Sequence, residues 1–247
     1  MSGYHGLARF YDLLTGDISY SSRADYFERL IKRYAPNARL LLDLACGTGS
    51  LSVELARRGF DVIAVDGSFE MLSELLQKKL ETELEILPLC QDMPRLDLYG
   101  TVDATVCALD SLNHLTDERL VKKTIERVAL FTNPGGVFAF DVNSEYKHRE
   151  VLGDNVFVYD YDEVYCVWQN AYDPATQTVE MDLDIFECRD GAYYRSADHI
   201  AERAYSGEFL RETLNGCGFG EIYCFDEDSF DPPRPDSQRL VYLAVKN

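Results

Sequence analysis

Apolar runs and helical repeats alternate along the first 143 residues of the chain. Residues 40–44 and 61–66 are nearly continuous apolar runs, which are typical of strands buried on both faces of a parallel sheet. Residues 51–58 between them have helical spacing, and Gly59 is placed to end that helix. The alternation predicts an α/β fold with a mostly parallel sheet. Further strands are predicted at residues 85–90, 102–109 and 137–142, and predicted helix caps are Ser21 or Ser22, Ser68 and Thr116.

The pattern changes near residue 150. Short aromatic runs at residues 157–161 and 164–168 are followed by residues 179–185, where apolar side chains alternate with acidic ones. Such alternation indicates a half-buried antiparallel strand, and Asp190-Gly191 is a hairpin signal. A helix from Ser206 and strands at 219–225 and 239–245 then resume the α/β pattern. We therefore predict an N-terminal lid or helical segment (1–35), a core (36–143 and 206–247), and an inserted antiparallel β meander (144–205).

The charge of the chain limits the classes of partner. It has 43 acidic and 24 basic side chains, and its formal net charge is −19. A field of that sign repels polyanions, so nucleic acid and anionic membrane surfaces are disfavoured as partners. The basic pairs Arg57-Arg58 and Lys78-Lys79 lie in helical patterns, where they are typical of solvated helix faces.

The cysteines and histidines give no sign of a disulfide framework or a metal centre. The seven cysteines include no Cys-x-x-Cys pair, and several lie in apolar strand patterns, which favours a reducing compartment. His5, His148 and His199 are not at metal-ligand spacing, so no metal is expected. The sequence also lacks a signal-peptide pattern and a long apolar run, so we expect a cytoplasmic protein.

A glycine turn between the first two predicted strands carries the clearest chemical signal. Asp43-Leu44-Ala45-Cys46-Gly47-Thr48-Gly49 ends in Gly-x-Gly and lacks the third glycine of the dinucleotide fingerprint. An acid beside the turn repels a pyrophosphate and attracts an ammonium. Asp66 ends the next strand, where a carboxylate accepts hydrogen bonds from the hydroxyls of an adenosine ribose. Together the two acids favour S-adenosylmethionine over NAD.

These segments resemble class I S-adenosylmethionine-dependent methyltransferases of the small-molecule type. Asp43 to Gly49 looks like the family's motif I, and its Ala-Cys variant is common in enzymes such as glycine N-methyltransferase. Asp66, Gln91-Asp92-Met93 and the Pro134-Gly135-Gly136 turn match later family positions in order. The resemblance implies a Rossmann-like, seven-stranded sheet with helices on both faces and a reversed last strand. More loosely, Tyr11-Asp12 and the meander look like a group of bacterial methyltransferases, which brings no substrate with it.

The resemblance implies two sets of site residues. The expected cofactor-binding residues are Asp43, Ala45, Cys46, Gly47, Gly49, Asp66, Gly67, Met71, Gln91, Asp92, Met93 and Leu109. The expected catalytic or substrate-facing residues are Tyr11, Asp110, Asn113 and His114. His114 is either a general base or a cap of its loop. Tyr11 either closes over the cofactor or packs against the sheet edge, and Cys46 and Cys107 are interpreted as packed residues, not nucleophiles.

We therefore predict methyl transfer to a small molecule. The alternatives left open by the sequence are a protein or RNA methyltransferase and a non-enzymatic S-adenosylmethionine-binding module. The net charge disfavours RNA and suits a basic protein. The meander is expected either to cover the site or to form the surface of a homodimer.

Overall fold

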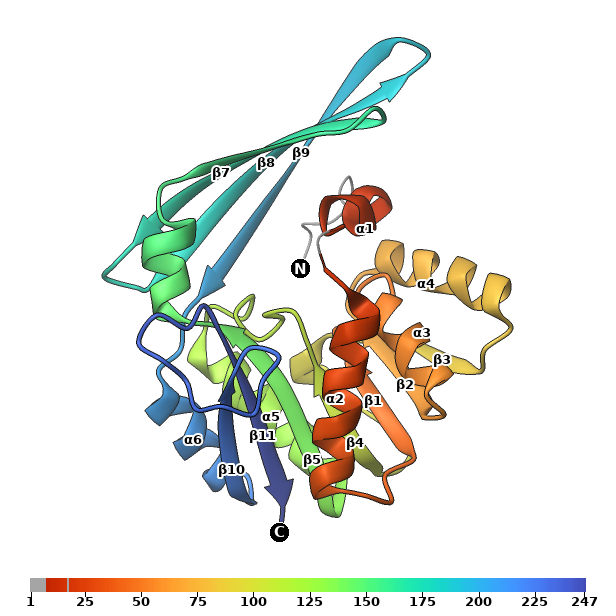
Figure 1. Ribbon diagram of the computed structural model, residues 1–247, viewed down its shortest axis with the longest axis vertical. Helices are drawn as coiled ribbons and strands as arrows, with labels where there is room; N and C mark the ends of the chain where they lie inside the picture. The colour runs from red at the N-terminus through yellow and green to blue at the C-terminus, as the bar shows by residue number, and fades with distance from the viewer. Residues whose placement is uncertain (1–7, 17) are drawn as a thin grey trace.

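The protein is described here from a computed structural model, which covers residues 8–16 and 18–247; His5 lies outside the described residues. Two β-sheets and their helices make up this part of the chain (Figure 1). The larger sheet has the strand order β10-β11-β5-β4-β1-β2-β3. Its strands are β1 (Leu40–Leu44), β2 (Asp61–Asp66), β3 (Ile86–Cys90), β4 (Val102–Cys107), β5 (Thr132–Asn143), β10 (Phe219–Asp226) and β11 (Arg239–Lys246).

All strand pairs of this sheet are parallel except those made by β11, which runs antiparallel to both β5 and β10. The predicted Rossmann-like sheet with a reversed last strand is confirmed. Because the parallel strands β1, β2 and β4 share one carboxyl edge, the loops that follow them lie at the same edge of the sheet. That edge holds Asp43, Asp66 and the segment after Cys107.

Helices cover both faces of the larger sheet, as predicted. Buried side chains of α2, α3 and α4 pack on one face, and those of α5 and α6 pack on the other. The five helices are α2 (Tyr20–Tyr34), α3 (Ser50–Arg57), α4 (Phe69–Thr82), α5 (Glu118–Leu130) and α6 (Gly207–Gly216). Shorter pieces are η1 (Ala8–Phe10), α1 (Tyr11–Leu14), η2 (Met93–Arg95) and the π-helix η3 (Lys147–Leu152).

Two predicted helix caps are wrong. The Ser19 hydroxyl accepts the N–H of Ser22 at 3.3 Å, so α2 begins before the predicted caps Ser21 and Ser22. Asp117, not Thr116, caps α5, because its carboxylate accepts the N–H of Arg119 at 2.9 Å. In both places neighbouring polar residues compete for the cap position, and spacing alone does not choose between them. The predicted cap Ser68 is confirmed, because its hydroxyl accepts the N–H of Met71. Ser206, where a helix was predicted to begin, is the cap of α6 and accepts the N–H of Phe209.

The turn at residues 133–136 lies within β5 and does not precede it. Thr132 pairs with Val102, and the register then shifts so that Val137 pairs with Ala104. The glycine-containing turn is therefore a bulge that the longer strand accommodates. The predicted strand, residues 137–142, is the regular part of β5.

The second sheet is a four-stranded antiparallel meander in the order β6-β7-β8-β9. Its strands are β6 (Val156–Asp160), β7 (Val164–Asp173), β8 (Thr178–Arg189) and β9 (Ala192–Arg203). Asp190 and Gly191 both have positive φ, as a two-residue hairpin turn requires. The inner side chains of β7 and β8 form a small core with Phe10 and Leu14 of the N-terminal segment. Figure 1 shows this sheet extending over the same end of the molecule as α1.

Within the described part of the chain, every helix is too short or too polar to cross a membrane.

Candidate active site

The glycine turn after β1 is left-handed at three positions. Ala45, Gly47 and Gly49 have φ values of 59°, 55° and 75°. A Cβ on Gly47 would meet no atom within 4 Å, so the backbone there borders open space. A Cβ on Gly49 would lie 2.2 Å from Leu75 Cδ1, so this glycine lets the start of α3 pack against α4. The two glycines therefore have different roles, one facing a pocket and the other buried in helix packing.

Asp66, at the end of β2, ties the glycine turn to the next helix. Its carboxylate accepts the N–H of Gly47 at 2.9 Å and the N–H of Ser68 at 2.8 Å. Burial raises the pKa of Asp66 above its ordinary value, while these main-chain hydrogen bonds favour the ionised form. The carboxylate is thus held in one orientation, and its remaining lone pairs border a pocket.

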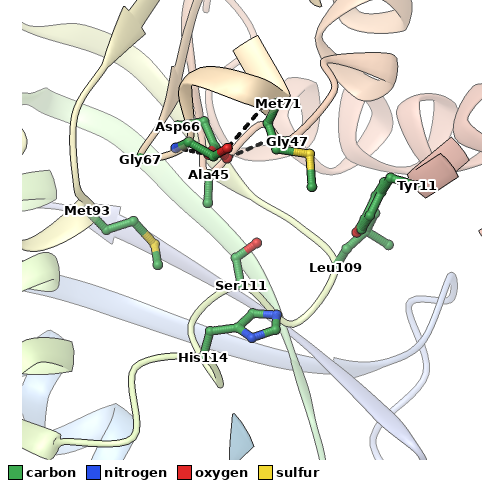
Figure 2. Close-up of a pocket in the computed structure, with 11 residues that line it drawn as sticks. Tyr11, Ala45, Gly47, Asp66, Gly67, Met71, Met93, Leu109, Ser111 and His114 are labelled. Carbon is green, nitrogen blue, oxygen red and sulfur yellow. Dashed lines mark hydrogen bonds between the residues drawn. The ribbon is translucent and has the colours of Figure 1, made fainter. Parts of the chain in front are cut away.

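This glycine-turn pocket lies at the carboxyl edge of β1, β2 and β4. Figure 2 shows Asp66 and Gly47 on one side of it and Ser111 and His114 across from them. The side chains of Met71 and Met93 add apolar walls. The lining residues are Tyr11, Ala45, Gly47, Asp66, Gly67, Ser68, Met71, Met93, Leu109, Ser111 and His114.

An inner pocket adjoins it on the β1 side and contains Asp43. Its lining residues are Tyr11, Tyr20, Asp43, Ala45, Cys46, Gly47, Thr48, Ser50, Leu51, Ala108, Leu109 and Ser111. Asp43 is only 1% exposed and accepts a hydrogen bond from the Ser52 hydroxyl. Burial, opposed by the hydrogen bond from Ser52 and aided by the negative charge of Asp66, raises its pKa to about 7.

Three predicted cofactor residues do not line either pocket. The side chain of Gln91 is engaged elsewhere, because its amide exchanges two hydrogen bonds with the main chain of Asp97. A contact between Gln91 and the cofactor therefore stays a prediction. Asp92 lies behind Gly67, with its Oδ1 3.0 Å from the position of a Gly67 Cβ. Gly49 is the third, and it acts through packing.

A strained turn follows β4. Leu109 and Asp110 both have positive φ, at 57° and 53°. The fully buried carboxylate of Asp141 accepts the N–H of Leu109 at 2.9 Å and that of Asp110 at 2.7 Å. Arg239 of β11 bonds both Asp141 and Asp110, at 2.5 Å and 2.6 Å. These bonds hold a backbone conformation that non-glycine residues adopt at a cost of order 1–3 kcal/mol each.

Arg239 also keeps the carboxyl group of Asp110 ionised. Burial opposes ionisation of this carboxyl, but the adjacent guanidinium outweighs it and holds the pKa of Asp110 well below its usual range. Lys147 is a second cation nearby, and burial together with Arg239 lowers its pKa. Asp110 is consequently an anion already paired inside the protein.

Asn113 lines none of the three pockets described here, and its contact with substrate stays a prediction. Its side chain is fully buried. It donates to the carbonyls of Asn143 and Arg203 and accepts the N–H of Asn143 at 3.0 Å. Because it bonds β5 and β9 at once, Asn113 fixes the meander to the core beneath His114.

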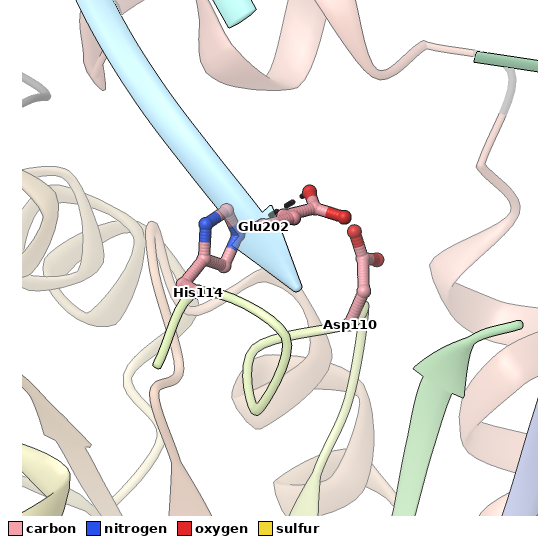
Figure 3. Close-up of side chains that lie close together, drawn as sticks. All are labelled: Asp110, His114 and Glu202. Atoms are coloured by element: carbon pink, nitrogen blue, oxygen red, sulfur yellow. Dashed lines mark ion pairs between the residues drawn. The ribbon is translucent and has the colours of Figure 1, made fainter. Parts of the chain in front are cut away.

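His114 and Glu202 meet at the edge of the site. Glu202 comes from β9, and its Oε1 lies 3.8 Å from His114 Nε2, beyond hydrogen-bond distance (Figure 3). Its other oxygen is 2.9 Å from Asn143 Nδ2 and 3.1 Å from His148 Nε2. Suitable atoms of Asp110, His114 and Glu202 lie within 4.8 Å of one another. Because Arg239 and Lys147 sit beside Asp110, we assign the group to charge pairing and not to a metal.

The N-terminal segment is fastened over the glycine turn. Asp12 of α1 accepts hydrogen bonds from Thr48 at 2.7 Å and Ser50 at 3.1 Å, and it pairs with Lys78. This cluster holds the neighbouring Tyr11 in place, where it lines both pockets.

A larger cavity of about 650 Å³ lies between the core and the meander. It shares Tyr11, Leu109 and His114 with the glycine-turn pocket, so the two spaces meet at those residues. Its other lining residues include Arg23, Asp110, Lys147, Glu202 and Arg239 on the charged side, and Leu14, Phe157, Tyr159, Trp168, Met181, Leu183 and Ile200 on the apolar side.

Comparison with known proteins agrees with this geometry. The family described as "Methyltransferase domain" matches residues 41–136. The chain is 34% identical to "Putative methyltransferase YqeM" of Bacillus subtilis, over 99% of this chain and 97% of that protein. It superimposes with a TM-score of 0.89 on an S-adenosylmethionine-dependent methyltransferase of Clostridium acetobutylicum, at 33% identity over 99% of both chains. The chain belongs to the class I S-adenosylmethionine-dependent methyltransferases.

A glycine/sarcosine N-methyltransferase of Halorhodospira halochloris is 34% identical over 132 residues, which span 53% of this chain and 48% of that protein. The region of similarity is therefore about half of each chain.

The pockets of this methyltransferase suit its cofactor, S-adenosylmethionine. The glycine-turn pocket and the inner pocket each carry a carboxyl group, and neither has a lysine or arginine among its described lining residues. Such a lining favours a cationic ligand without phosphates. Asp66 would hold the ribose, Met71 and Met93 the adenine, and Asp43 and the open backbone at Gly47 the amino-acid tail.

The cysteines of the methyltransferase are not placed for covalent chemistry. Cys107 is fully buried, and burial raises the pKa of its thiol well above the ordinary value. Burial likewise raises the pKa of Cys46, which lines the inner pocket. Both thiols therefore stay protonated near neutral pH and act as packed side chains.

The sequence reasoning missed several lining residues. Ser68 and Ser111 border the glycine-turn pocket, and both stood within segments already singled out. Glu202 and Arg239 were also missed, and they carry no local signal, because only the topology of β9 and β11 brings them to His114 and Asp110.

Proposed function

We propose that this enzyme methylates a small organic molecule, which binds in the large cavity between the core and the meander. The observation that carries the proposal is the junction of the two spaces at Tyr11, Leu109 and His114. A cavity of about 650 Å³ lies within the usual range of roughly 300–1,000 Å³ for small-molecule sites. In this proposal residues 144–205 form a wall of the acceptor site, and residues 8–35 carry the lid residue Tyr11.

The chain's own residues perform positioning and proton removal. When bound, the cofactor supplies an activated methyl group on a sulfonium. Tyr11 and Leu109 exclude water from the junction, and the strained turn at Leu109 and Asp110 fixes the geometry at its edge. His114 acts as a proton acceptor there, supported by the carboxylate of Glu202. Asp43 and Asp66 are cofactor-binding residues in this assignment.

Charge and relatives support a small acceptor. A net charge of −19 opposes RNA as the substrate. The related protein of Halorhodospira halochloris is named for methylating glycine and sarcosine, which are small molecules. The seven free cysteines suit a reducing compartment, and we infer a cytoplasmic location from them.

A transfer assay with methyl-labelled cofactor tests the proposal. The purified enzyme and the Asp66→Ala variant are incubated with panels of small amines, hydroxy acids and thiols, and separately with a basic protein and with tRNA. We expect label in the small-molecule fraction with the wild type and none with the variant. Label found only in the protein or RNA fraction would overturn the proposal.

A further inference from the structure

The large cavity has two chemically different sides. Apolar and aromatic side chains from β6, β7, β8 and β9 line the side formed by the meander, among them Phe157, Trp168 and Met181. Charged side chains line the other side, where His114 of the core is part of the junction and Glu202, near the end of β9, lies 3.8 Å from it. A ligand that fills this space must be amphipathic, with an apolar body and a polar head.

The residue that would bind the polar head, Glu202, is negatively charged, so the head should be positive. The Glu202 carboxylate is nearly buried, with 6% of its side chain exposed. Oε2 is bonded by Asn143 and His148, and Oε1 faces His114 across 3.8 Å. Among the described residues, no lysine or arginine lies within ion-pair distance of Glu202. A buried carboxylate without a fixed cation favours a cationic ligand beside it.

The other carboxylates around the junction already have a fixed cation. Asp110 is bonded by Arg239 and by Asn143 Nδ2, and Arg239 also bonds Asp141. Lys147 donates to the neutral Asn143 Oδ1 at 2.9 Å, and it feels the charges of Asp110, Glu202 and Glu227 without forming an ion pair with Glu202. Glu202 is therefore the carboxylate at this edge that has no described lysine or arginine in an ion pair with it, and a cationic ligand would supply that positive charge.

The apolar body is indicated by Trp168. This residue lines the cavity, and its buried indole N–H has no acceptor among the described residues. A buried donor without a partner is unfavourable, and the face of an aromatic ring can accept such an N–H, so this orphaned donor favours an aromatic body beside Trp168. The aromatic neighbours Phe157 and Tyr159 provide flat surface around it.

We propose that the acceptor is an amine carried on a bulky apolar body, with its ammonium head at Glu202 and His114 and its body against Trp168. This inference rests on the proposed function. The ammonium gives one proton to His114 Nε2, which becomes an imidazolium beside Glu202, and the nitrogen lone pair becomes free to receive the methyl group. The proton then passes to solvent. Free glycine has no apolar body, so it is a poor acceptor despite the names of some relatives.

Trp168 is the single tryptophan of the chain, so its fluorescence reports binding at the cavity wall directly. The full-length protein, saturated with S-adenosylhomocysteine, is titrated with phenylalkylamines of two to six methylenes, with the matching phenylalkyl carboxylates, and with glycine. We expect saturable changes in emission from at least one amine. Carboxylates of equal length and glycine should bind at least about tenfold more weakly.

Two variants test the two sides of the cavity separately. Glu202→Gln should weaken amine binding at least about tenfold, while Glu180→Gln, an exposed change on β8, should leave it unchanged. If Glu202→Gln does not fold by circular dichroism, Ile200→Phe provides the second test, because it fills the wall without touching the carboxylate. Ile200→Phe should weaken the longer amines and spare cofactor binding.

The inference would be overturned if glycine or the carboxylates bound as tightly as the amines. It would also be overturned if Glu202→Gln bound the amines with wild-type affinity. Failure of every phenylalkylamine to change Trp168 emission would also overturn it. These failures differ from failure of the proposed function, which appears as cofactor-dependent label in protein or RNA alone. Methylation of neutral small molecules in place of amines refutes this inference and leaves the proposed function standing.

Discussion

Replacing Asp43 by asparagine should remove a pH-dependent loss of stability from the cofactor-free enzyme. The buried carboxyl has a pKa of about 7, compared with 3.8 for the exposed acid. Between about pH 4 and pH 7 the unfolded chain releases this proton while the folded chain keeps it. Unfolding therefore becomes easier as the pH rises through that window, and no further loss occurs above it.

The magnitude follows from the shift. Each pKa unit corresponds to about 1.4 kcal/mol, so a shift of about three units gives at most ~4 kcal/mol. Between pH 5 and pH 7 the part lost is roughly 2 kcal/mol. Asparagine is neutral and close in shape to the protonated acid, and its amide can still meet the Ser52 hydroxyl. The stability of Asp43→Asn relative to wild type should thus rise by roughly 2 kcal/mol over those two pH units.

Urea denaturation followed by circular dichroism at pH 5, 6 and 7 measures this difference without cofactor. Asp61→Asn, an exposed change at the other end of β2, is the matched control and should track the wild type at each pH. A stability difference between Asp43→Asn and wild type that stays constant from pH 5 to pH 7 would refute the assigned burial of this charge.

Three further substitutions separate the roles of neighbouring groups. Gly49→Ala should destabilise the fold by about 1–3 kcal/mol, because the new methyl group clashes with Leu75. Gly47→Ala should chiefly weaken cofactor binding, measured by calorimetry. Equal effects of the two substitutions on stability would contradict the different roles assigned to these glycines. Asp12→Ala should speed cofactor release in stopped-flow measurements, because it unfastens α1, and an unchanged off-rate would argue against a lid. Arg239→Met should cost about 3–5 kcal/mol in denaturation, because it removes the short ion pairs to the buried Asp141 and to Asp110 and leaves Asp141 only the longer one to Arg23. The exposed Arg234→Met should cost little.

Much of the fold was predictable because its signals are local. β1 and β2 are buried on both faces and are therefore apolar runs in the sequence. Their predicted bounds agree with the observed ones to within a residue. The alternation along β8 and the Asp190-Gly191 turn likewise predicted the antiparallel strands of the meander. Helix starts were harder where serines or acids are adjacent, as at Ser19 and Asp117, because several side chains compete for one cap.

The site was predictable only in part. Asp43 and Asp66 could be found because strand ends of a parallel sheet meet at one edge. A motif gives the position of a residue but not the direction of its side chain. In the structure the Asn113 side chain bonds main-chain groups, and the Gln91 side chain bonds Asp97. Glu202 and Arg239 are 88 and 129 residues from His114 and Asp110, respectively, and no sequence pattern joins them.

Calorimetric titration of the wild type and Asp66→Ala with S-adenosylmethionine tests the central claim most directly, namely that the glycine-turn pocket is the cofactor site. The account predicts saturable binding to the wild type and a loss of at least about tenfold in affinity in the variant, with its circular dichroism unchanged. Wild-type affinity in a folded Asp66→Ala protein would contradict the assignment of this pocket.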